Sequence, residues 1–378
     1  MKYDYIFAGL GLASMMIIVK MENEGILEGK NILVVEPNDK NANDRTWCFW
    51  EEGDGDWDQI LTHKWSRAFY VDENVKIDCL NGSFYKMIES KNFYDFFRKT
   101  TRNCSLYWVK ERVISFREEN NSVIVQTAAD NYEGAILFNS IFDIEELDSN
   151  KKFPLLQQNF VGWFIETDNN YFNPEEALFM DFSVSQKGNT RFMYVLPLSE
   201  NKALFEYTLF SPDLLSFEEY ELEIKEYLKK IGLENYNILA KEKGNIPMTT
   251  YPFWKKNSKL ILNIGTAGGW TKASSGFTFS NVIRESQRVV DFLKRDAIDF
   301  KKFKVPTKFT FYDDLFVDVL YNDNSLGKVI FSSMFTKSDP NLILKFLDEK
   351  TTMFEDLQII WSCPKKEFIK SFFRRLIK

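Results

Sequence analysis

The sequence contains a single histidine, His63, and its cysteines are scattered along the chain without any CxxC pair. A Ser-His-Asp triad or a histidine metal site would depend on that one imidazole, so we expect neither, and we place His63 in a loop or on the surface. The cysteine spacing predicts neither a disulfide framework nor a zinc site, and it suits a reducing compartment. The cysteines are Cys48, Cys79, Cys104 and Cys363.

Long apolar runs are also missing. No stretch of about 18 uninterrupted apolar residues occurs, and the N-terminus lacks the features of a signal peptide. We therefore expect no transmembrane helix and a cytoplasmic location. The net charge of −7 argues against a nucleic-acid partner, and no residue pattern suggests a metal.

Aromatic residues, by contrast, are abundant. They make up 16 % of the 378 residues, and 36 of them are phenylalanine. This supply could simply fill the cores of the two or three domains that such a length allows. It also suits a pocket for a large flat or polyunsaturated ligand.

The N-terminal segment has the pattern of a βαβ unit that binds a dinucleotide. An apolar strand, Tyr3 to Ala8, leads into a Gly-x-Gly turn and a helix, and a second strand from Asn31 to Val35 follows. In such units the helix N-terminus faces a pyrophosphate, and the acid after the second strand binds a ribose hydroxyl. The residues that we assign to this site are Gly9, Gly11, Leu12, Ala13, Ser14 at the third fingerprint position, and Glu36.

A second strand, glycine loop and helix occur roughly 250 residues later, as "KLILNIG", "TAGGWTKASSG" and "FTFSNVIRESQRVVDFLKR". A plain NAD-binding domain does not require this unit. A flavin fold does, because a late segment returns to the first sheet and its helix N-terminus approaches the isoalloxazine ring. The residues that we expect near the ring are Gly268, Gly269, Ser275, Gly276 and Thr278, and Gly265 before them is also expected to bind the cofactor.

Four strand-like segments between residues 160 and 212 predict an antiparallel sheet. In the last of them, "NKALFEYTLFSP", Glu206 and Thr208 share one face, whereas Phe205 and Tyr207 fall on the other. Taken alone, a half-solvated face would explain a glutamate in this apolar strand. From about residue 300 the chain predicts helices, and the last of these, "KKEFIKSFFRRLIK", is amphipathic and basic.

Four separated stretches resemble the lycopene cyclases of carotenoid biosynthesis, in the bacterial flavoprotein class. They are "FAGLGLAS" with "VVEP", "NDRTWCFWE", "RFMYVLPLSENKALFEYTLFS", and "GNIPMTTYPF" with "IGTAGGWTKASSGFTFSNVI". The resemblance implies an α/β fold, α+β overall. It would have a Rossmann-like FAD-binding domain of the glutathione-reductase or p-hydroxybenzoate-hydroxylase type, an antiparallel-sheet substrate domain and a helical C-terminal part.

The resemblance also implies non-redox cyclisation of the acyclic ends of lycopene into β-ionone rings, giving β-carotene through γ-carotene. FAD in its reduced form is the expected cofactor, with NAD(P)H as its reductant. Glu206 is the expected acid and Thr208 its partner, because a proton must be delivered to a C=C bond by a neutral carboxyl group in a dry pocket. Arg45 and Thr46 are expected near the ADP half of FAD. Trp47, Phe49, Trp50 and Tyr207 are expected to line the substrate pocket, although core packing explains the first three equally well.

Two positions depart from the wider pattern. Thr266 follows Gly265 where many flavoproteins have aspartate, so a hydroxyl or backbone group must replace that ribityl contact. Tyr207 follows Glu206 where many bacterial cyclases have a second acid, so an acid pair at adjacent positions cannot be the mechanism.

The predicted organisation has three parts. An FAD-binding domain combines residues 1–60, 100–150 and 255–295, a substrate-binding domain combines 61–99 and 151–254, and 296–378 form a helical C-terminal region. Residues Lys365 to Lys378 are the expected contact with the membrane surface from which lycopene is drawn. The alternatives are an FAD-dependent monooxygenase, a prenyl-chain reductase and a non-enzymatic carotenoid-binding flavoprotein.

Overall fold

The computed structural model describes residues 1–148, 152–304 and 306–376. Its first sheet has seven strands in the order β8-β2-β1-β11-β10-β9, with β17 paired to β11. The pairs β8–β2, β2–β1, β1–β11 and β11–β17 are parallel, and β9 and β10 form an antiparallel hairpin. The strands are β1 (Lys2–Ala8), β2 (Asn31–Val35), β8 (Ser105–Val109), β9 (Ser115–Glu119), β10 (Ser122–Gln126), β11 (Asn131–Asn139) and β17 (Ile261–Asn263).

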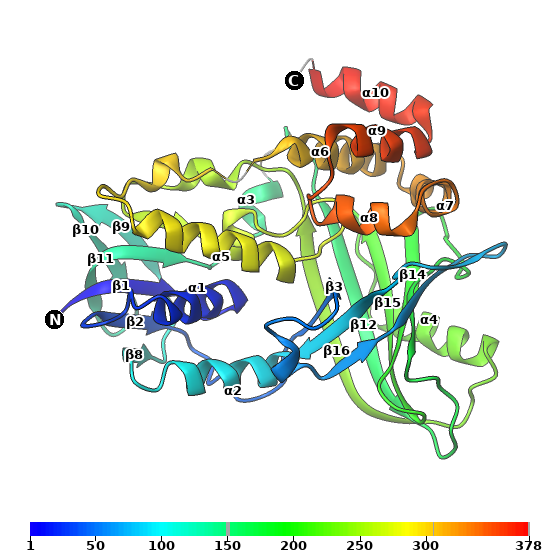
Figure 1. Cartoon of the computed structure of the whole chain (residues 1–378), viewed down its shortest axis with the longest axis horizontal. Helices are drawn as coiled ribbons and strands as arrows, with labels where there is room; N and C mark the ends of the chain where they lie inside the picture. Colours follow the sequence, from blue (N-terminus) through cyan, green and yellow to red (C-terminus); the bar gives the residue numbers. More distant parts are fainter. Residues whose placement is uncertain (149–151, 305, 377–378) are drawn as a thin grey trace.

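Helices α1 (Leu12–Asn23) and α5 (Phe279–Leu293) pack against each other beside this sheet (Figure 1). The central positions of α1 are apolar all round, because the sheet lies on one side of it and α5 on the other. Since β1, β11 and β17 are parallel, their carboxyl ends lie at one edge of the sheet. The two glycine turns, which follow β1 and β17, therefore meet at the same edge, as the sequence predicts for a flavin fold.

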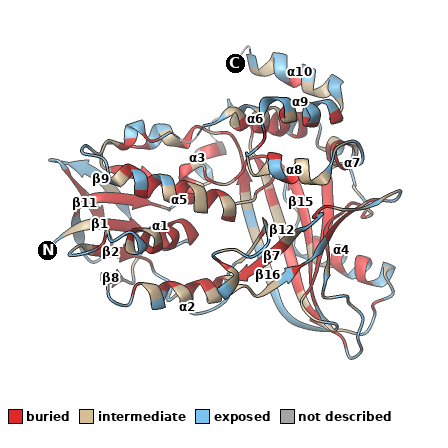
Figure 2. Cartoon of the chain, in the orientation of Figure 1, coloured by how far each residue is buried: buried red, intermediate tan, exposed pale blue. Residues whose placement is uncertain are grey.

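The second sheet also has seven strands, in the order β16-β12-β15-β14-β13-β5-β6, and it is antiparallel except where β13 pairs with β5. Helix α4 (Phe217–Lys230) covers one face, and Figure 2 shows the middle strands as buried. The predicted antiparallel sheet and the fold class are confirmed. The strands are β5 (Arg67–Val71), β6 (Lys76–Asp78), β12 (Leu156–Glu166), β13 (Glu176–Asp181), β14 (Thr190–Pro197), β15 (Lys202–Ser211) and β16 (Asn237–Met248).

A small third sheet, in the order β3-β7-β4, connects the two large ones. Its strands are β3 (Thr46–Glu52), β4 (His63–Trp65) and β7 (Ser83–Glu89), and α2 (Ser90–Thr100) follows β7. His63 is half-buried in β4, with Nε2 2.7 Å from the carbonyl oxygen of Pro174. The expectation that His63 lies in a loop is therefore wrong, because it belongs to a strand and is partly exposed.

The C-terminal part is helical, as predicted, and covers the remaining face of the second sheet (Figure 1). Thr307 caps α6, Asp339 caps α8 with a proline in its first turn, and Thr352 caps α9. None of the helices in the described part of the chain is long and apolar enough to span a membrane. The remaining helices are α3 (Glu145–Asp148), α6 (Lys308–Asn322), α7 (Gly327–Lys337), α8 (Pro340–Leu347), α9 (Met353–Ser362) and α10 (Lys365–Leu376).

Candidate active site

A cavity of about 460 Å³ lies where the three sheets meet. It is lined by residues from many separated segments of the chain, including both glycine turns, the start of β3, and strands β15 and β16. It brings together a large share of the residues that the sequence singled out. The predicted residues that line it are Gly11, Leu12, Ala13, Arg45, Thr46, Trp47, Glu206, Gly265, Ser275, Gly276 and Thr278.

The first glycine turn leaves the start of α1 open to this cavity. Gly9 has a φ of +85°, and a Cβ there would overlap Ser140 Oγ, so only glycine fits. Ser14 closes the turn by donating from its hydroxyl to the Gly9 carbonyl at 2.8 Å. No described side chain caps α1 at Gly11, and no acidic residue stands in its first turn. The N–H groups and positive dipole end of α1 are thus free for an anion.

Glu36 follows β2 and supports the same turn from behind. Its carboxylate accepts from the backbone N–H of Leu10 at 2.9 Å and from that of Asn38 at 3.0 Å. The side chain is buried and does not line the cavity. In this structure Glu36 therefore holds the glycine turn, and its contact with a ribose stays a prediction.

The second glycine loop forms the opposite wall. Gly276 has a φ of +74°, and a Cβ there would overlap Oε1 of Gln158. Gln158 Oε1 and Ser275 Oγ are buried in the cavity wall without a hydrogen-bond partner among the described residues, so the wall has unused polar groups that a ligand could bind. Thr266, at the position of the usual aspartate, also lines the cavity.

Gly268 and Gly269 do not line the cavity, and they act through the loop's backbone. A Cβ at Gly268 would overlap the carbonyl oxygen of Asn263, and Gly269 is left-handed with a φ of +74°. Both glycines are therefore required by the tight turn after β17, and their predicted approach to a flavin ring is untested.

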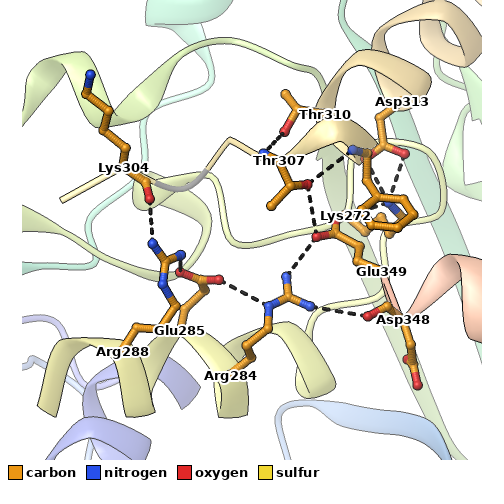
Figure 3. Close-up of polar contacts among 11 residues, drawn as sticks. Lys272, Arg284, Glu285, Arg288, Lys304, Thr307, Thr310, Asp313, Asp348 and Glu349 are labelled. Atoms are coloured by element: carbon orange, nitrogen blue, oxygen red, sulfur yellow. Dashed lines mark hydrogen bonds and ion pairs between the residues drawn. The ribbon is translucent and has the colours of Figure 1, made fainter. Parts of the chain in front are cut away.

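A buried ionic network ties the second glycine loop to the C-terminal helices (Figure 3). Lys272 in the loop donates to both carboxylate oxygens of Asp313 at 2.9 Å and to Glu349 at 3.2 Å. Arg284 of α5 pairs with Glu349 at 3.2 Å and with Glu285 at 3.2 Å. The loop thus depends on α6 and on the segment after α8 for its position.

Glu206 lies on the face of β15 that lines the cavity. It is half-buried because it borders the cavity, and Tyr194 stands opposite it on β14. Thr208 donates from its hydroxyl to Glu206 Oε1 at 3.0 Å. Burial, together with the negative charge of Glu242, raises the pKa of Glu206 well above its ordinary value. The raised pKa favours the neutral carboxylic acid, which is the form that can donate a proton.

Glu242 on β16 is not evident from the sequence, because "LAKEKG" alternates charge in a way typical of an exposed loop or edge strand. Glu242 lines the cavity, forms a hydrogen bond with Glu206, and accepts from the Thr46 hydroxyl at 3.0 Å. Burial raises its pKa as well. The signal that could have found it is its place two residues before "GNIPMTTYPF", one of the stretches that carry the resemblance.

The aromatic residues predicted for the pocket lie in different places. Trp47 lines the cavity, and Phe49 stacks on Phe279 of α5, with ring centroids 4.5 Å apart. Trp50 contacts Phe277 edge-on at 4.8 Å.

Tyr207 requires a correction, because its side chain is on the opposite face of the second sheet. There it packs edge-on against Tyr220 of α4, with ring centroids 6.0 Å apart. It belongs to the core beneath α4 and does not line the cavity, since the alternation of β15 turns it away from Glu206.

A second cavity, of about 430 Å³, adjoins the first and is almost entirely apolar. Tyr194, Ser275 and Phe277 line both cavities, so the two meet beside Glu206. Residues of α6 to α10 form its outer walls. They include Phe316, Phe335, Phe346, Trp361, Phe368 and Phe372.

Comparison with known proteins agrees with this geometry. The family described as "Lycopene cyclase protein" matches residues 4–373. Lycopene beta-cyclase from Pantoea ananas is 22 % identical over 299 residues, which cover 76 % of this chain and 74 % of that protein.

Solved structures share the fold at low sequence identity. A flavoprotein/dehydrogenase from Cytophaga hutchinsonii superposes with a TM-score of 0.62 at 11 % identity, covering 99 % of this chain and 98 % of the other. A geranylgeranyl bacteriochlorophyll reductase-like protein from Thermoplasma acidophilum gives 0.59 at 11 % identity, with 99 % of each chain covered. The chain, including its two glycine turns, therefore has a fold that also occurs in flavoproteins.

Proposed function

This chain belongs to the lycopene cyclase family, and on that premise we propose that it converts the acyclic ends of lycopene into β-ionone rings. The product would be β-carotene, formed by way of γ-carotene. The observation that carries the proposal is Glu206, a half-buried carboxyl group that faces a cavity and whose raised pKa favours the neutral form. It stands where this cavity meets the apolar one.

The chemistry explains why such a carboxyl group is needed. An alkene is a very weak base, so its protonation requires a neutral acid in a site without competing water. Burial supplies the neutral form of Glu206, and Thr208 fixes its orientation. After the proton leaves, the carboxylate attracts the carbocation, and the faces of Tyr194 and Phe277 can stabilise it by cation–π contact.

FAD is the cofactor that we propose for the first cavity. The uncapped start of α1, the unpartnered oxygens of Gln158 and Ser275, and the glycine-only conformation at Gly276 fit a dinucleotide with a flavin ring. We assign the ADP half to Gly9, Gly11 and the other residues of the first turn, with Arg45 and Thr46 beside it, and the ring to the second loop. Reduced FAD, when bound, supplies negative charge near the carbocation, and NAD(P)H is its proposed reductant.

The second cavity suits the hydrocarbon chain of the substrate. Its walls are apolar and aromatic, and its inner end is at Tyr194 and Phe277, next to Glu206. A polyene bound there would place its terminal double bond against the acid and keep the rest of the chain out of water.

We also propose that α9 and α10 contact a membrane surface. Arg374 and Arg375 of α10 point inward and pair with Asp318 and Asp314 of α6, so the basic face that the sequence predicts is partly used for packing. Apolar residues of α9 and α10 are exposed, and some residues of both helices also line the second cavity. Figure 2 shows exposed positions along both helices. Residues 377 and 378, part of the predicted anchor, lie outside the described residues. The exposed apolar side chains are Met353, Phe354, Leu357, Ile360 and Trp361 on α9, and Ile369, Phe372, Phe373 and Leu376 on α10.

The test is to express the chain in a host that accumulates lycopene and to identify the pigments by chromatography and mass. We expect β-carotene and γ-carotene from the wild type. Glu206→Gln should leave lycopene unchanged while retaining FAD, because the amide keeps the shape and loses the proton. Saturated or hydroxylated products would instead support a prenyl-chain reductase or a monooxygenase. Carotenoid that is bound but unaltered would support a carrier.

A further inference from the structure

Glu206 and Glu242 meet across a gap that a glycine leaves open. Gly162 of β12 pairs with Glu206 of β15 on one side and with Glu242 of β16 on the other. A Cβ at position 162 would lie 3.0 Å from Cγ of Glu242 and 2.9 Å from Cδ1 of Leu204. Both distances are shorter than normal carbon contacts, so any side chain at this position would fill the space through which the two carboxyl groups reach each other.

The hydrogen bonds around the two carboxyl groups differ. Thr46 donates to Glu242 at 3.0 Å, and the positive charge of Arg45 acts on Glu242. Both favour the ionised form of Glu242. Among the described residues, the Thr208 hydroxyl is the further donor to Glu206, and the charge of Glu242 acts against its ionisation.

Other titratable groups near the pair come from several elements. Those that are neutral at neutral pH include Tyr194 on β14, Tyr85 on β7 and Cys48 on β3, and burial raises the pKa of each. Glu89, at the end of β7, adds negative charge near Glu242. Lys243 also lines the cavity. Of these groups, Glu242 is the one that forms a hydrogen bond with Glu206.

We propose that Glu206 and Glu242 act as one carboxyl pair that holds a single proton, with Glu206 as the donor and Glu242 as its ionised partner. The use of that proton rests on the proposed cyclase function, but the pair itself can be measured without a substrate. Glu242 is a positioning residue in this scheme, because it keeps Glu206 protonated and fixes its orientation. The acid pair of this chain therefore lies across three strands and not at adjacent positions of one strand.

The two carboxyl groups can supply and take back every proton that the reaction needs. Glu206 donates its proton to one carbon of the terminal double bond, and the π electrons of that bond form the new C–H bond. The other carbon becomes a tertiary cation beside two carboxylates. A second double bond of the chain attacks the cation and closes the ring by a C–C bond. A neighbouring ring carbon then loses its proton to one of the carboxylates, which forms the ring double bond and restores the singly protonated pair. One proton enters and one leaves, so no oxidant is consumed.

Infrared titration of the purified protein tests the pair directly. The carboxylic-acid C=O band of the wild type should persist at neutral pH and should be absent from Glu206→Gln. In Glu242→Gln the band should disappear at lower pH than in the wild type, because the negative charge that disfavours ionisation of Glu206 is gone. Glu166→Gln is the matched control, since it removes a carboxylate from the same sheet at its pair with Lys202. It should titrate like the wild type.

The rate of ring formation against pH gives the second readout. In Glu242→Gln the fall in rate on the alkaline side of the pH–rate profile should begin at lower pH than in the wild type. Turnover should fall several-fold at alkaline pH and less at acidic pH. A merely structural role would lower the rate equally at all pH values. Identical infrared titrations of Glu242→Gln and wild type would overturn the pair. A shifted infrared titration in a protein that forms no ring would support the pair and contradict the proposed function.

Discussion

Thr208 donates a hydrogen bond to Glu206 at 3.0 Å, two residues further along the same face of β15. Because Thr208 is fully buried, Thr208→Val removes this hydrogen bond at nearly constant volume. We expect turnover to fall about tenfold, since a hydrogen bond to an ionisable group contributes about 1.5–3 kcal/mol and part of that remains available through Glu242. The measurement is the initial rate of ring formation with FAD content recorded in parallel. Thr167→Val, which removes a buried threonine hydroxyl elsewhere in the sheet domain, should leave the rate unchanged.

The raised pKa of Glu206 makes a prediction about stability. Burial raises its pKa in the folded state, so the folded protein holds this proton more tightly than the unfolded chain does. This contribution to the free energy of unfolding is fully present below the pKa of glutamate in the unfolded chain, about 4.3. It is lost as the pH rises through the pKa of Glu206 in the folded protein. Glu206→Gln removes this dependence. We therefore expect the melting temperature of Glu206→Gln minus that of the wild type to increase as the pH rises between these two pKa values. Above the folded-state pKa the difference should stay constant. A constant difference in melting temperature across the window would contradict the raised pKa.

The sequence predicts the elements with strong periodicity well. The strand Asn31–Val35 and both glycine turns follow from apolar runs that stop at residues with special backbone conformations. The alternation in β15 likewise assigns Tyr207 to the face opposite Glu206. The prediction that Tyr207 lines the pocket followed from its position next to Glu206 in the sequence. It was wrong because neighbouring residues of a strand point to opposite faces.

The parts that the sequence could not predict depend on long-range pairing. Glu242 reaches Glu206 only because β12 lies between β15 and β16 with Gly162 in register with both, and no local pattern encodes that register. The final helix is a similar case. Its amphipathic period was evident, but the direction of its apolar face is set by Asp314 and Asp318 on another helix.

Gly276→Ala should weaken FAD binding. A Cβ at this position overlaps Gln158 Oε1 in the cavity wall, and the φ of +74° strains any L-residue. Gly188→Ala is the matched control, because it has a φ of +84° in an exposed turn with no atom within 4 Å of the added Cβ. Both variants should lose about 1 kcal/mol of stability from strain. Only Gly276→Ala should raise the dissociation constant of FAD, by at least about tenfold, as measured by quenching of flavin fluorescence.

Lys272→Met should destabilise the fold strongly. Its ammonium is buried against Asp313 and Glu349, and removal of one partner of a buried pair costs about 3–5 kcal/mol. Burial raises the pKa of Asp313, so the loss should be greater at alkaline pH, where Asp313 cannot escape by taking up a proton. Urea unfolding measures the effect, and adding Asp313→Asn should recover part of it. Lys91→Met, which removes an exposed pair with Asp95, should change stability by less than about 1 kcal/mol.

Membrane binding should depend on the outward apolar face of α9. Phe354 and Trp361 are 72 % and 73 % exposed, and each should contribute about 1.5–3 kcal/mol when buried in the interfacial region of a bilayer. The double variant Phe354→Ser/Trp361→Ser should therefore reduce co-sedimentation with vesicles of anionic lipid by more than about tenfold. Its melting temperature should hardly change, since both side chains face away from the core.

The control for this prediction removes two exposed apolar residues from another surface. Leu222 on α4 and Leu239 on β16 are 51 % and 52 % exposed, and Leu222→Ser/Leu239→Ser should bind vesicles like the wild type. Raising the salt concentration should weaken binding only in part, because Lys365 and Lys366 are exposed beside the apolar face whereas Arg374 and Arg375 are held by carboxylates of α6. Equal losses in the two double variants would mean that the vesicles bind exposed apolar side chains without preference, and the α9–α10 face would then not be the membrane contact.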